Sequence, residues 1–456
     1  MENGEEIIQS EELKEEEQGV TVETIEEEKP RNVFTNKNFV LTFFGALVSN
    51  LGNLLYSFAV SFYILELTGN NATIQGIYLA TGGITYVLIT LFGGVISDRF
   101  HKGKIMYICD YLKGAVIISF TLLMMLLFKD STARIVILFI IAVLGNAIAA
   151  IFSPASASLL PRIVPQKSLQ QAQSYYSVME SSISILGIIL AGILYSILPI
   201  NVLFLIVGGC YIISAISEMF IRYEHKKSEE KLTVKVVFSD IGIGIKYIFN
   251  FKMLFYLIIT ILFVNFFFSP LTSNFLPYFI KADVATKNYM FMENMKPEMW
   301  NSIISVAFAV GMIIMAMIMS MKKQKDKIIK GLRIGFILVD VIYVALAVSY
   351  ILFSKTTIDV NAMLIIFIGG ALCLGLTLPM INIPTSTKMM TLVEKDKLGK
   401  VSSAVNIGSQ GLIPLSNLLA GLVITYLGCS WLLLVCSAGL CLLTVVLFVN
   451  KHISQL

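Results

Sequence analysis

Acidic side chains inside long apolar segments are the first candidates for chemistry in this sequence. A carboxylate in hydrocarbon is unfavourable unless it faces protein or water, so such residues often mark a path for protons or ions. Five acidic residues lie within or at the ends of apolar segments: Glu66, Asp110, Glu180, Glu218 and Asp340. Glu66 and Glu218 are at segment ends, where we expect water to solvate them.

Glu180 is the candidate with the fewest competing explanations. On a helix it lies about 10 Å into its segment. It shares a polar stripe with Gln173 and Ser184, and its segment has no basic residue nearby. We predict that Glu180 is the proton-coupling group, which binds and releases a proton as the protein changes state. Direct contact with a cationic substrate is the alternative role.

Asp110 has a basic neighbour on the same face of its helix, because Lys113 follows three residues later. We predict that this pair braces the end of the helix. Asp340 lies 230 residues after Asp110. We expect Asp340 to brace the equivalent helix in a second half of the chain.

Two further segments carry stripes of uncharged polar side chains. At 100° per residue, Asn50, Asn53 and Ser57 fall on one face of a helix. The sequence around Pro270 offers a second set: Asn265, Ser269 and Thr272. We predict that both stripes contact a substrate. For the serines, close packing between helices is the alternative.

Other kinds of site are disfavoured by the residue types present. The three histidines lie at the edges of apolar segments, and HExxH, GxSG and GxGD motifs are absent, which argues against an intramembrane enzyme. The six cysteines form no CxxC pair, so the sequence predicts neither a metal site nor a disulfide framework. It also lacks a nucleotide-binding loop, and we expect no cofactor.

The most specific local pattern is the charged stretch GGVISDRFHKGK at residues 93–104. It resembles the G-x-x-x-D-R-x-x-x-x-K loop that follows the second helix in the major facilitator superfamily. The residues concerned are Gly94, Asp98, Arg99, Gly103 and Lys104. The resemblance implies that Gly94 allows close helix packing and that Asp98 accepts from a helix N-terminus of the other half. Arg99 and Lys104 would hold the loop through charge-assisted bonds, and the motif would close the cytoplasmic side in one state. Ordinary cytoplasmic loop charges are the alternative.

Four shorter patterns are similar to the branch of this superfamily that contains macrolide-efflux proteins and siderophore exporters. They are ELTG at 66–69, DYLK at 110–113, FSPA at 152–155 and LPRIVP at 160–165. The resemblance implies that helices 1, 4, 7 and 10 line a central cavity, with helices 3 and 9 outside it. Residues 143–147 lack the arginine of many proton-driven drug exporters, and residues 187–192 lack the Gly-Pro pair of the antiporter signature.

Twelve apolar segments are long enough to position these residues on membrane-crossing helices, each of which needs about twenty residues. Hydrophobic residues make up 56% of the chain and charged residues 14%, with a mean hydropathy of +0.81. The sequence therefore predicts an all-α membrane protein. The predicted helices are 38–66, 73–97, 104–128, 134–158, 173–198, 201–222, 254–281, 301–321, 331–353, 361–387, 400–427 and 429–449.

The twelve predicted helices form two related halves. Pro154 and Pro384 show the same 230-residue offset as the two aspartates, and several anchors at one offset indicate an internal repeat. This predicts two pseudo-symmetric six-helix bundles, the layout of a transporter built from parallel repeats. The predicted parts are a disordered acidic tail (1–36), a bundle (37–222), a linker with an amphipathic helix (223–250), a second bundle (251–450) and a short end (451–456).

Basic residues predict the orientation of the chain. Of the 34 lysines and arginines, 27 fall in the termini and the loops on their side, and six fall in the opposite loops. Because cytoplasmic loops are enriched in basic residues, both termini are predicted to be cytoplasmic. We expect a multi-pass protein of the plasma membrane.

The predicted function is secondary active transport that exports a hydrophobic or amphipathic, drug-like small molecule by alternating access, coupled to protons. Its expected partners are this small molecule, protons and membrane lipid, with no nucleic acid, and we expect a monomer. Two alternatives remain at this stage. One is a facilitator or flippase for a lysolipid or a metabolite, and the other is a membrane sensor that does not transport.

Overall fold

The computed structural model describes residues 33–165, 168–223, 242, 246–287, 295–320, 329–393 and 398–449. No strand occurs among these residues. The predicted end at 451–456, most of the predicted linker and the acidic tail up to residue 32 lie outside the described residues. The described chain starts with a short 3-10 helix, η1 (Val33–Thr35), in which Val33 is buried in a cluster that includes Phe39. Structure therefore begins before the predicted boundary at 36.

Six membrane-crossing segments form the N-terminal half, and each agrees with a predicted span to within a few residues. They are α2 (Lys37–Leu67), α3 (Ala72–Arg99), α4 (Lys102–Leu126), α5 (Ser131–Ile163), the composite of α6 (Leu169–Ser182), η3 (Ile183–Gly187) and α7 (Ile188–Ile197), and α8 (Ile200–Met219). Side chains at the starts of three helices accept backbone N–H groups that have no partner within the helix: those of Asn36, Asn71 and Asp130.

The C-terminal half repeats this arrangement. Its segments are the composite of α10 (Lys252–Pro270), η4 (Leu271–Phe275), α11 (Leu276–Tyr278) and η5 (Phe279–Val284), followed by α12 (Glu298–Ser320), α13 (Ile329–Ser354), α14 (Val360–Leu392), α15 (Leu398–Leu427) and α16 (Cys429–Val449). Among the described residues, eleven segments are long and apolar enough to cross a membrane, and α15 contributes the shorter apolar stretch Gly411–Leu427. The predicted all-α fold is confirmed.

Two of the composite segments contain wider π-helical turns that the sequence did not predict. In the N-terminal half, the hydroxyls of Ser181, Ser182 and Ser184 donate to carbonyls four residues earlier, around the start of η3. Such bonds compete with the backbone ladder and loosen it. In the C-terminal half, η4 follows Pro270 and η5 follows Pro277, and proline provides no backbone N–H for the regular ladder.

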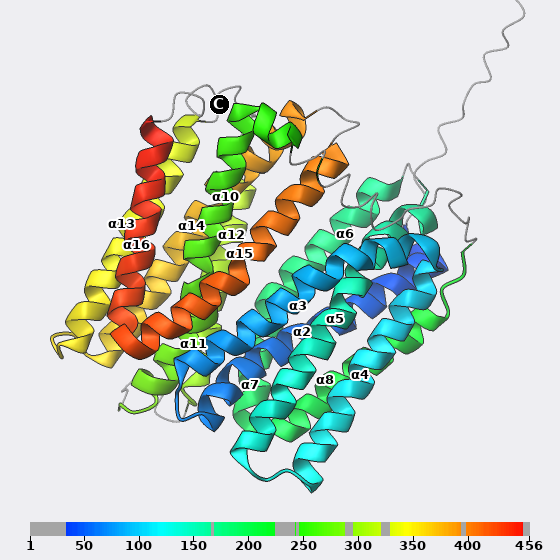
Figure 1. Cartoon of the computed structure of the whole chain (residues 1–456), viewed down its shortest axis with the longest axis horizontal. Helices are drawn as coiled ribbons and strands as arrows, with labels where there is room; N and C mark the ends of the chain where they lie inside the picture. The colour runs from blue at the N-terminus through cyan, green and yellow to red at the C-terminus, as the bar shows by residue number, and fades with distance from the viewer. Residues whose placement is uncertain are drawn as a thin grey trace, which may run out of the picture.

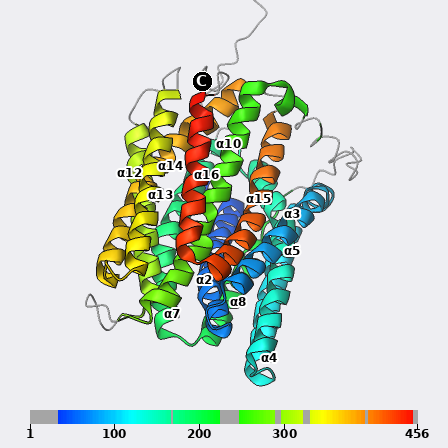
Figure 2. The ribbon, with the colours of Figure 1, turned by 60° about the vertical axis from the view of Figure 1, so that its left-hand side comes forward.

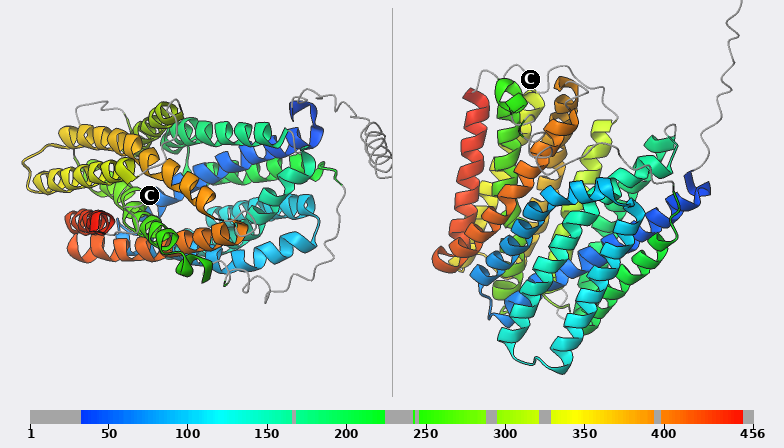
Figure 3. Two further views of the ribbon diagram at one scale, coloured as in Figure 1. Left: turned by 90° about the horizontal axis from the view of Figure 1, so that it is seen from above. Right: turned by 45° about the vertical axis from the view of Figure 1, so that its right-hand side comes forward.

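The two halves stand side by side as separate bundles (Figure 1, Figure 3). We call the face at which α2 begins and α16 ends the termini face, and the opposite face the far face. In Figure 1 the C-terminal mark lies at the termini face, and the two bundles converge towards the far face near α3, α11 and α15.

The contact between α3 and α15 joins the halves (Figure 2). A Cβ placed on Gly76 would lie 3.0 Å from the Cα of Gly421 and 2.6 Å from the carbonyl oxygen of Asn417. Close by, the amide of Thr73 donates to the hydroxyl of Thr425 at 3.0 Å. These residues are in the first part of α3 and in the second half of α15. The helices therefore meet in the half of the molecule nearest the far face.

Candidate functional site

A cavity of about 570 Å³ lies within the N-terminal half, between α2, α3, α4, α5, α6 and α8. Its lining includes Thr42, near the start of α2, and Leu160, near the end of α5, so one end of the cavity is close to the termini face. Polar side chains from three helices project into it: Asn50, Asn53, Asp110, Lys113, Gln173 and Glu180. A cavity with this lining suits a substrate that carries a polar or charged group.

Asn53 connects the α2 wall of the cavity to α4 and α8. Its side-chain oxygen accepts hydrogen bonds from Lys113 Nζ at 3.4 Å and from the Tyr211 hydroxyl at 3.3 Å. Lys113 Nζ also lies 4.5 Å from the centroid of the Tyr211 ring, in a cation–π contact. Asn50 is exposed in the same cavity. Ser57 is exposed too, but it is not among the lining residues.

The predicted bracing pair on α4, Asp110 and Lys113, lies in the cavity wall and not outside the cavity as we expected. Asp110 is buried and Lys113 is half-buried. The position follows from packing: α4 lies against both α5 and α8, and Lys113 reaches Asn53 of α2 on the cavity side. Their repeat-related partner, Asp340 on α13, is buried away from this cavity.

Glu218 is enclosed by protein, so the prediction that water solvates it at a helix end is wrong. It lies in the last turn of α8, and its side chain is 1% exposed. Neither carboxylate oxygen has a hydrogen-bond partner among the described residues. Gly45 of α2 packs against it, and an added Cβ at Gly45 would lie 3.0 Å from Glu218 Cγ.

Sequence reasoning missed Glu218 because its burial depends on another helix. A signal was present in α2, where Gly45, Ser49 and Gly52 recur at helical spacing and are all buried. Small residues on one face allow a neighbouring helix to approach closely. At Gly45 and Gly52 that neighbour is α8.

Glu180 lies in the cavity, as its place on the α6 stripe suggested, and its side chain is exposed there. It lines the same wall as Gln173. Its backbone carbonyl accepts the hydroxyl of Ser184 at 2.9 Å, while the carboxylate forms no ion pair among the described residues. The carboxylate is thus open to a ligand.

The polar candidates of the C-terminal half do not line this cavity. Ser269 donates to the side-chain oxygen of Asn417 at 3.3 Å, which ties α10 to α15. Asn265 lines a separate space of about 210 Å³ within the C-terminal half. Thr272 lines another of about 70 Å³. The two stripes therefore do not line one common cavity among the described residues, and their contact with a substrate stays a prediction.

The loop motif is described in part. The backbone of Asp98 and Arg99 ends α3, but their side chains lie outside the described residues. Gly94 has nothing within 4 Å of an added Cβ, whereas Gly93 would place one 2.3 Å from the carbonyl oxygen of Ala150. The close packing expected at Gly94 is therefore found one residue earlier.

Beyond that point the chain turns into α4. His101 caps this helix by accepting the amide of Lys104 at 3.3 Å, and Gly103 is buried beside the His101 ring. Lys104 itself is exposed. The intervening Lys102, which sequence reasoning passed over, is 1% exposed and donates to the carbonyl of Ser97 at 2.8 Å.

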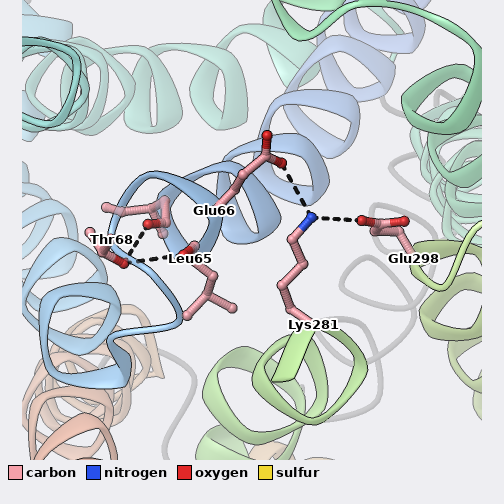
Figure 4. A network of polar contacts seen from close by, with 6 residues as sticks. Leu65, Glu66, Thr68, Lys281 and Glu298 are labelled. Carbon is pink, nitrogen blue, oxygen red and sulfur yellow. Dashed lines mark hydrogen bonds and ion pairs between the residues drawn. The ribbon is translucent and has the colours of Figure 1, made fainter. Parts of the chain in front are cut away.

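At the far face, one lysine is shared by two carboxylates from different segments (Figure 4). Lys281 Nζ in η5 lies 3.2 Å from Glu66 at the end of α2 and 2.9 Å from Glu298 at the start of α12. The side chain of Glu66 is 56% exposed, and that of Glu298 is 7% exposed. The pair with Glu66 crosses between the two halves, and so it holds them together at this face.

Curated proteins with similar sequences are membrane transporters. The uncharacterized MFS-type transporter YkuC of Bacillus subtilis (strain 168) is 24% identical over 81% of this chain and 82% of its own length. The staphyloferrin A transporter of Staphylococcus aureus (strain NCTC 8325 / PS 47) is 24% identical over 36% of this chain and 41% of its own. Macrolide efflux protein A of Streptococcus pyogenes is 25% identical over 39% of this chain and 43% of its own.

Solved structures share the fold at low sequence identity. A bacterial homologue of the iron transporter ferroportin superposes with a TM-score of 0.68 at 15% identity, over 92% of this chain and 99% of that one. The nucleoside transporter NupG superposes with a TM-score of 0.67 at 12% identity, over 90% and 99% of the two chains. The profile of the family described as Major Facilitator Superfamily matches residues 42–416. The chain belongs to the major facilitator superfamily, and it is a membrane transporter, not an enzyme.

Proposed function

We propose that this transporter exports an amphipathic, cationic small molecule by alternating access. The observation that carries the proposal is the cavity in the N-terminal half. Its lining holds Asn50, Asn53 and the carboxylate of Glu180, which forms no ion pair among the described residues. Aromatic side chains, among them Tyr86 and Phe152, line the same space. Aromatic faces attract cations, so this lining offers an apolar, an aromatic and an anionic contact together.

The orientation predicted from the basic residues supports export as the direction of transport. The excess of lysine and arginine assigns the termini face to the cytoplasm. The halves are joined at the far face through α3, α15 and Lys281, and the cavity reaches towards the termini face. The structure is then a state that takes up substrate from the cytoplasm. Opening of the far face would release it outside.

The position of Glu180 favours contact with the substrate over proton coupling. Glu180 is exposed and forms no ion pair among the described residues, so its carboxylate can contact a positively charged substrate directly. This was the alternative role at the level of sequence, and we now prefer it to the role of proton carrier.

A second candidate, transport of a lysolipid, is favoured by a groove between the two halves. A space of about 520 Å³ lies between the α6–η3 region and α12. It is lined by hydroxyls of Ser177 and Ser181 and by the apolar side chains of Leu186, Ile313 and Met317. Such a groove could hold an acyl chain, with the headgroup near Glu180 or Asn50.

The test is uptake of radiolabelled tetraphenylphosphonium, a lysolipid and an uncharged macrocycle into inside-out vesicles. We expect tetraphenylphosphonium to accumulate. Glu180→Gln should raise its KM at least about tenfold, because one charge-assisted contact contributes roughly 1.5–3 kcal/mol, and should leave transport of uncharged compounds unchanged.

The matched control is Asp340→Asn, which changes a buried carboxylate of the other half outside the cavity. Its KM for the cation should match the unmodified protein. Transport of the lysolipid alone would favour the second candidate. If Glu180→Gln leaves the KM of every tested compound unchanged, Glu180 is not part of the substrate site.

A further inference from the structure

A buried glutamate lies behind the wall of the cavity, next to an aspartate of the wall itself, and transport of substrate as described above does not use this pair. Glu218 of α8 and Asp110 of α4 are 1% and 4% exposed, and they are close enough to interact electrostatically. Both oxygens of Glu218 and one of Asp110 lack hydrogen-bond partners among the described residues. Buried carboxylates without hydrogen-bond partners indicate that the pair binds a ligand.

The neighbouring groups indicate which ligand would suit the pair. From α4, Lys113 faces Asp110, and Cys109 faces both carboxyl groups. From α6, Tyr176 faces Glu218, and on α8 Tyr211 faces Asp110. Around Gly45, α2 contributes backbone and small side chains; its ionisable residues are at its start or nearer the far face: Lys37, Tyr56, Tyr63 and Glu66.

One positive charge therefore faces two carboxyl groups. Lys37 and Arg222, which are near the same end of the bundle, are exposed. Lys113 can compensate Asp110, but a second negative charge on Glu218 would remain uncompensated where protein encloses the side chain. Two carboxylates that share a buried site cannot both be ionised at moderate cost. Among the described residues, no group of three or more His, Cys, Asp or Glu could hold a metal ion, so a proton is the ligand that fits.

We propose that Glu218 and Asp110 form a proton-binding pair that couples transport to the proton gradient. Asp110 links the two functions, because it lines the substrate cavity on one side and faces Glu218 on the other. This inference rests on the proposed function for the identity of the co-transported substrate, but the proton site itself does not depend on that identity.

Coupling follows from electrostatic competition across Asp110. With one proton on the pair, Lys113 balances the remaining charge, and the cavity attracts a cation through Glu180 and the aromatic lining. When a cation enters, it favours the doubly ionised pair, and the proton leaves Glu218 through Asp110 to the cavity. Substrate affinity should therefore rise with pH through the titration of the pair, by about tenfold per pH unit for one proton released. Proton binding from the other side would then expel the cation.

The experiment is pH-induced infrared difference spectroscopy of the full-length protein in lipid vesicles, where a protonated carboxyl group has a distinct C=O stretching band. We expect such a band to disappear as the pH is raised. It should be absent in Glu218→Gln, which keeps the size of the side chain and its uncharged state. In Asp340→Asn, the repeat-related control, the band should persist.

Binding of tetraphenylphosphonium gives a second, independent measurement. The unmodified protein should release close to one proton per cation bound, and Glu218→Gln should bind the cation with an affinity that no longer depends on pH. An infrared band that titrates identically in the unmodified protein and in Glu218→Gln would overturn the proton site. If proton-gradient-driven transport by Glu218→Gln equals that of the unmodified protein, Glu218 does not couple transport to protons. The proposed function would still hold, because transport of the cation persists. If no cation is transported at all, the proposed function fails while the infrared result still decides on the proton site.

Discussion

The two carboxylates that share Lys281 differ in how much they depend on it. Glu298 is almost enclosed, and its second oxygen has no partner among the described residues, whereas Glu66 is more than half exposed. A buried ion that loses its partner destabilises a structure by about 3–5 kcal/mol, while an exposed pair contributes about 0–1 kcal/mol. The lysine therefore matters chiefly because of Glu298.

At the residue scale we predict that Lys281→Gln weakens the closed far face. Removing the positive charge leaves Glu298 buried and unpaired, so states in which the far face opens become more populated. The change should appear as longer distances between spin labels at Lys129 and Lys355, two exposed positions in far-face turns of different halves.

Matched variants separate charge from packing in this prediction. Adding Glu298→Gln to Lys281→Gln removes the unpaired charge and should recover most of the original distance distribution. Glu66→Gln alone should change it little. Equal effects of Glu66→Gln and Lys281→Gln would contradict the view that the enclosed partner dominates.

At the scale of elements, the crossing of α3 and α15 depends on two glycines. A methyl group on Gly76 would meet backbone atoms of α15 at 2.6 Å and 3.0 Å, and backbone cannot move aside as a flexible side chain can. We predict that Gly76→Ala forces the helices apart, lowers the melting temperature and lengthens the distances between labels at the far face.

Gly369→Ala on α14 is the control, because a Cβ added there has nothing within 4 Å. It should be neutral or stabilising, because alanine favours a helix by about 1 kcal/mol over glycine. A larger loss in Gly369→Ala than in Gly76→Ala would contradict this account.

The same scale shows what could be predicted from the sequence. Each helix could be predicted because a run of about twenty apolar residues is a local property that a bilayer requires. The π-helical turns in η3 and η4 could not, because a wide turn differs from an α-turn by small shifts in hydrogen bonding. The burial of Glu218 and the sharing of Lys281 depend on where Gly45 and Glu298 lie in space. The small residues of α2 indicate that some helix packs closely there, but no local pattern says which residues that neighbour brings. Glu180 could be placed in the cavity because its stripe follows from one helix alone.

At the scale of the whole molecule, the described residues show contacts between the halves that gather towards one face. The α3–α15 crossing and the Lys281–Glu66 pair are near the far face, while the polar cavity reaches towards the termini face. Alternating access requires this asymmetry to reverse, with each bundle moving largely as a unit. The internal packing of a bundle should then be retained while the contacts between bundles are exchanged.

The last prediction tests this reversal with disulfides in a background without the six native cysteines. The amide of Thr73 lies 3.0 Å from the hydroxyl of Thr425, so cysteines at these positions can approach the Cα separation of roughly 4.4–6.8 Å that a disulfide needs. Oxidation should lower the transport rate at least about tenfold, because the far face can no longer open. Substrate binding from the termini face should be retained, and reduction should restore transport.

As the control, cysteines at Asn38 and Arg222, which hydrogen-bond to each other within the N-terminal bundle, should cross-link without loss of transport. Full transport by protein that is completely cross-linked between positions 73 and 425 would show that α3 and α15 do not separate during the cycle. In that case the protein would release its substrate by a local opening near the cavity and not by a rigid-body movement of the two bundles.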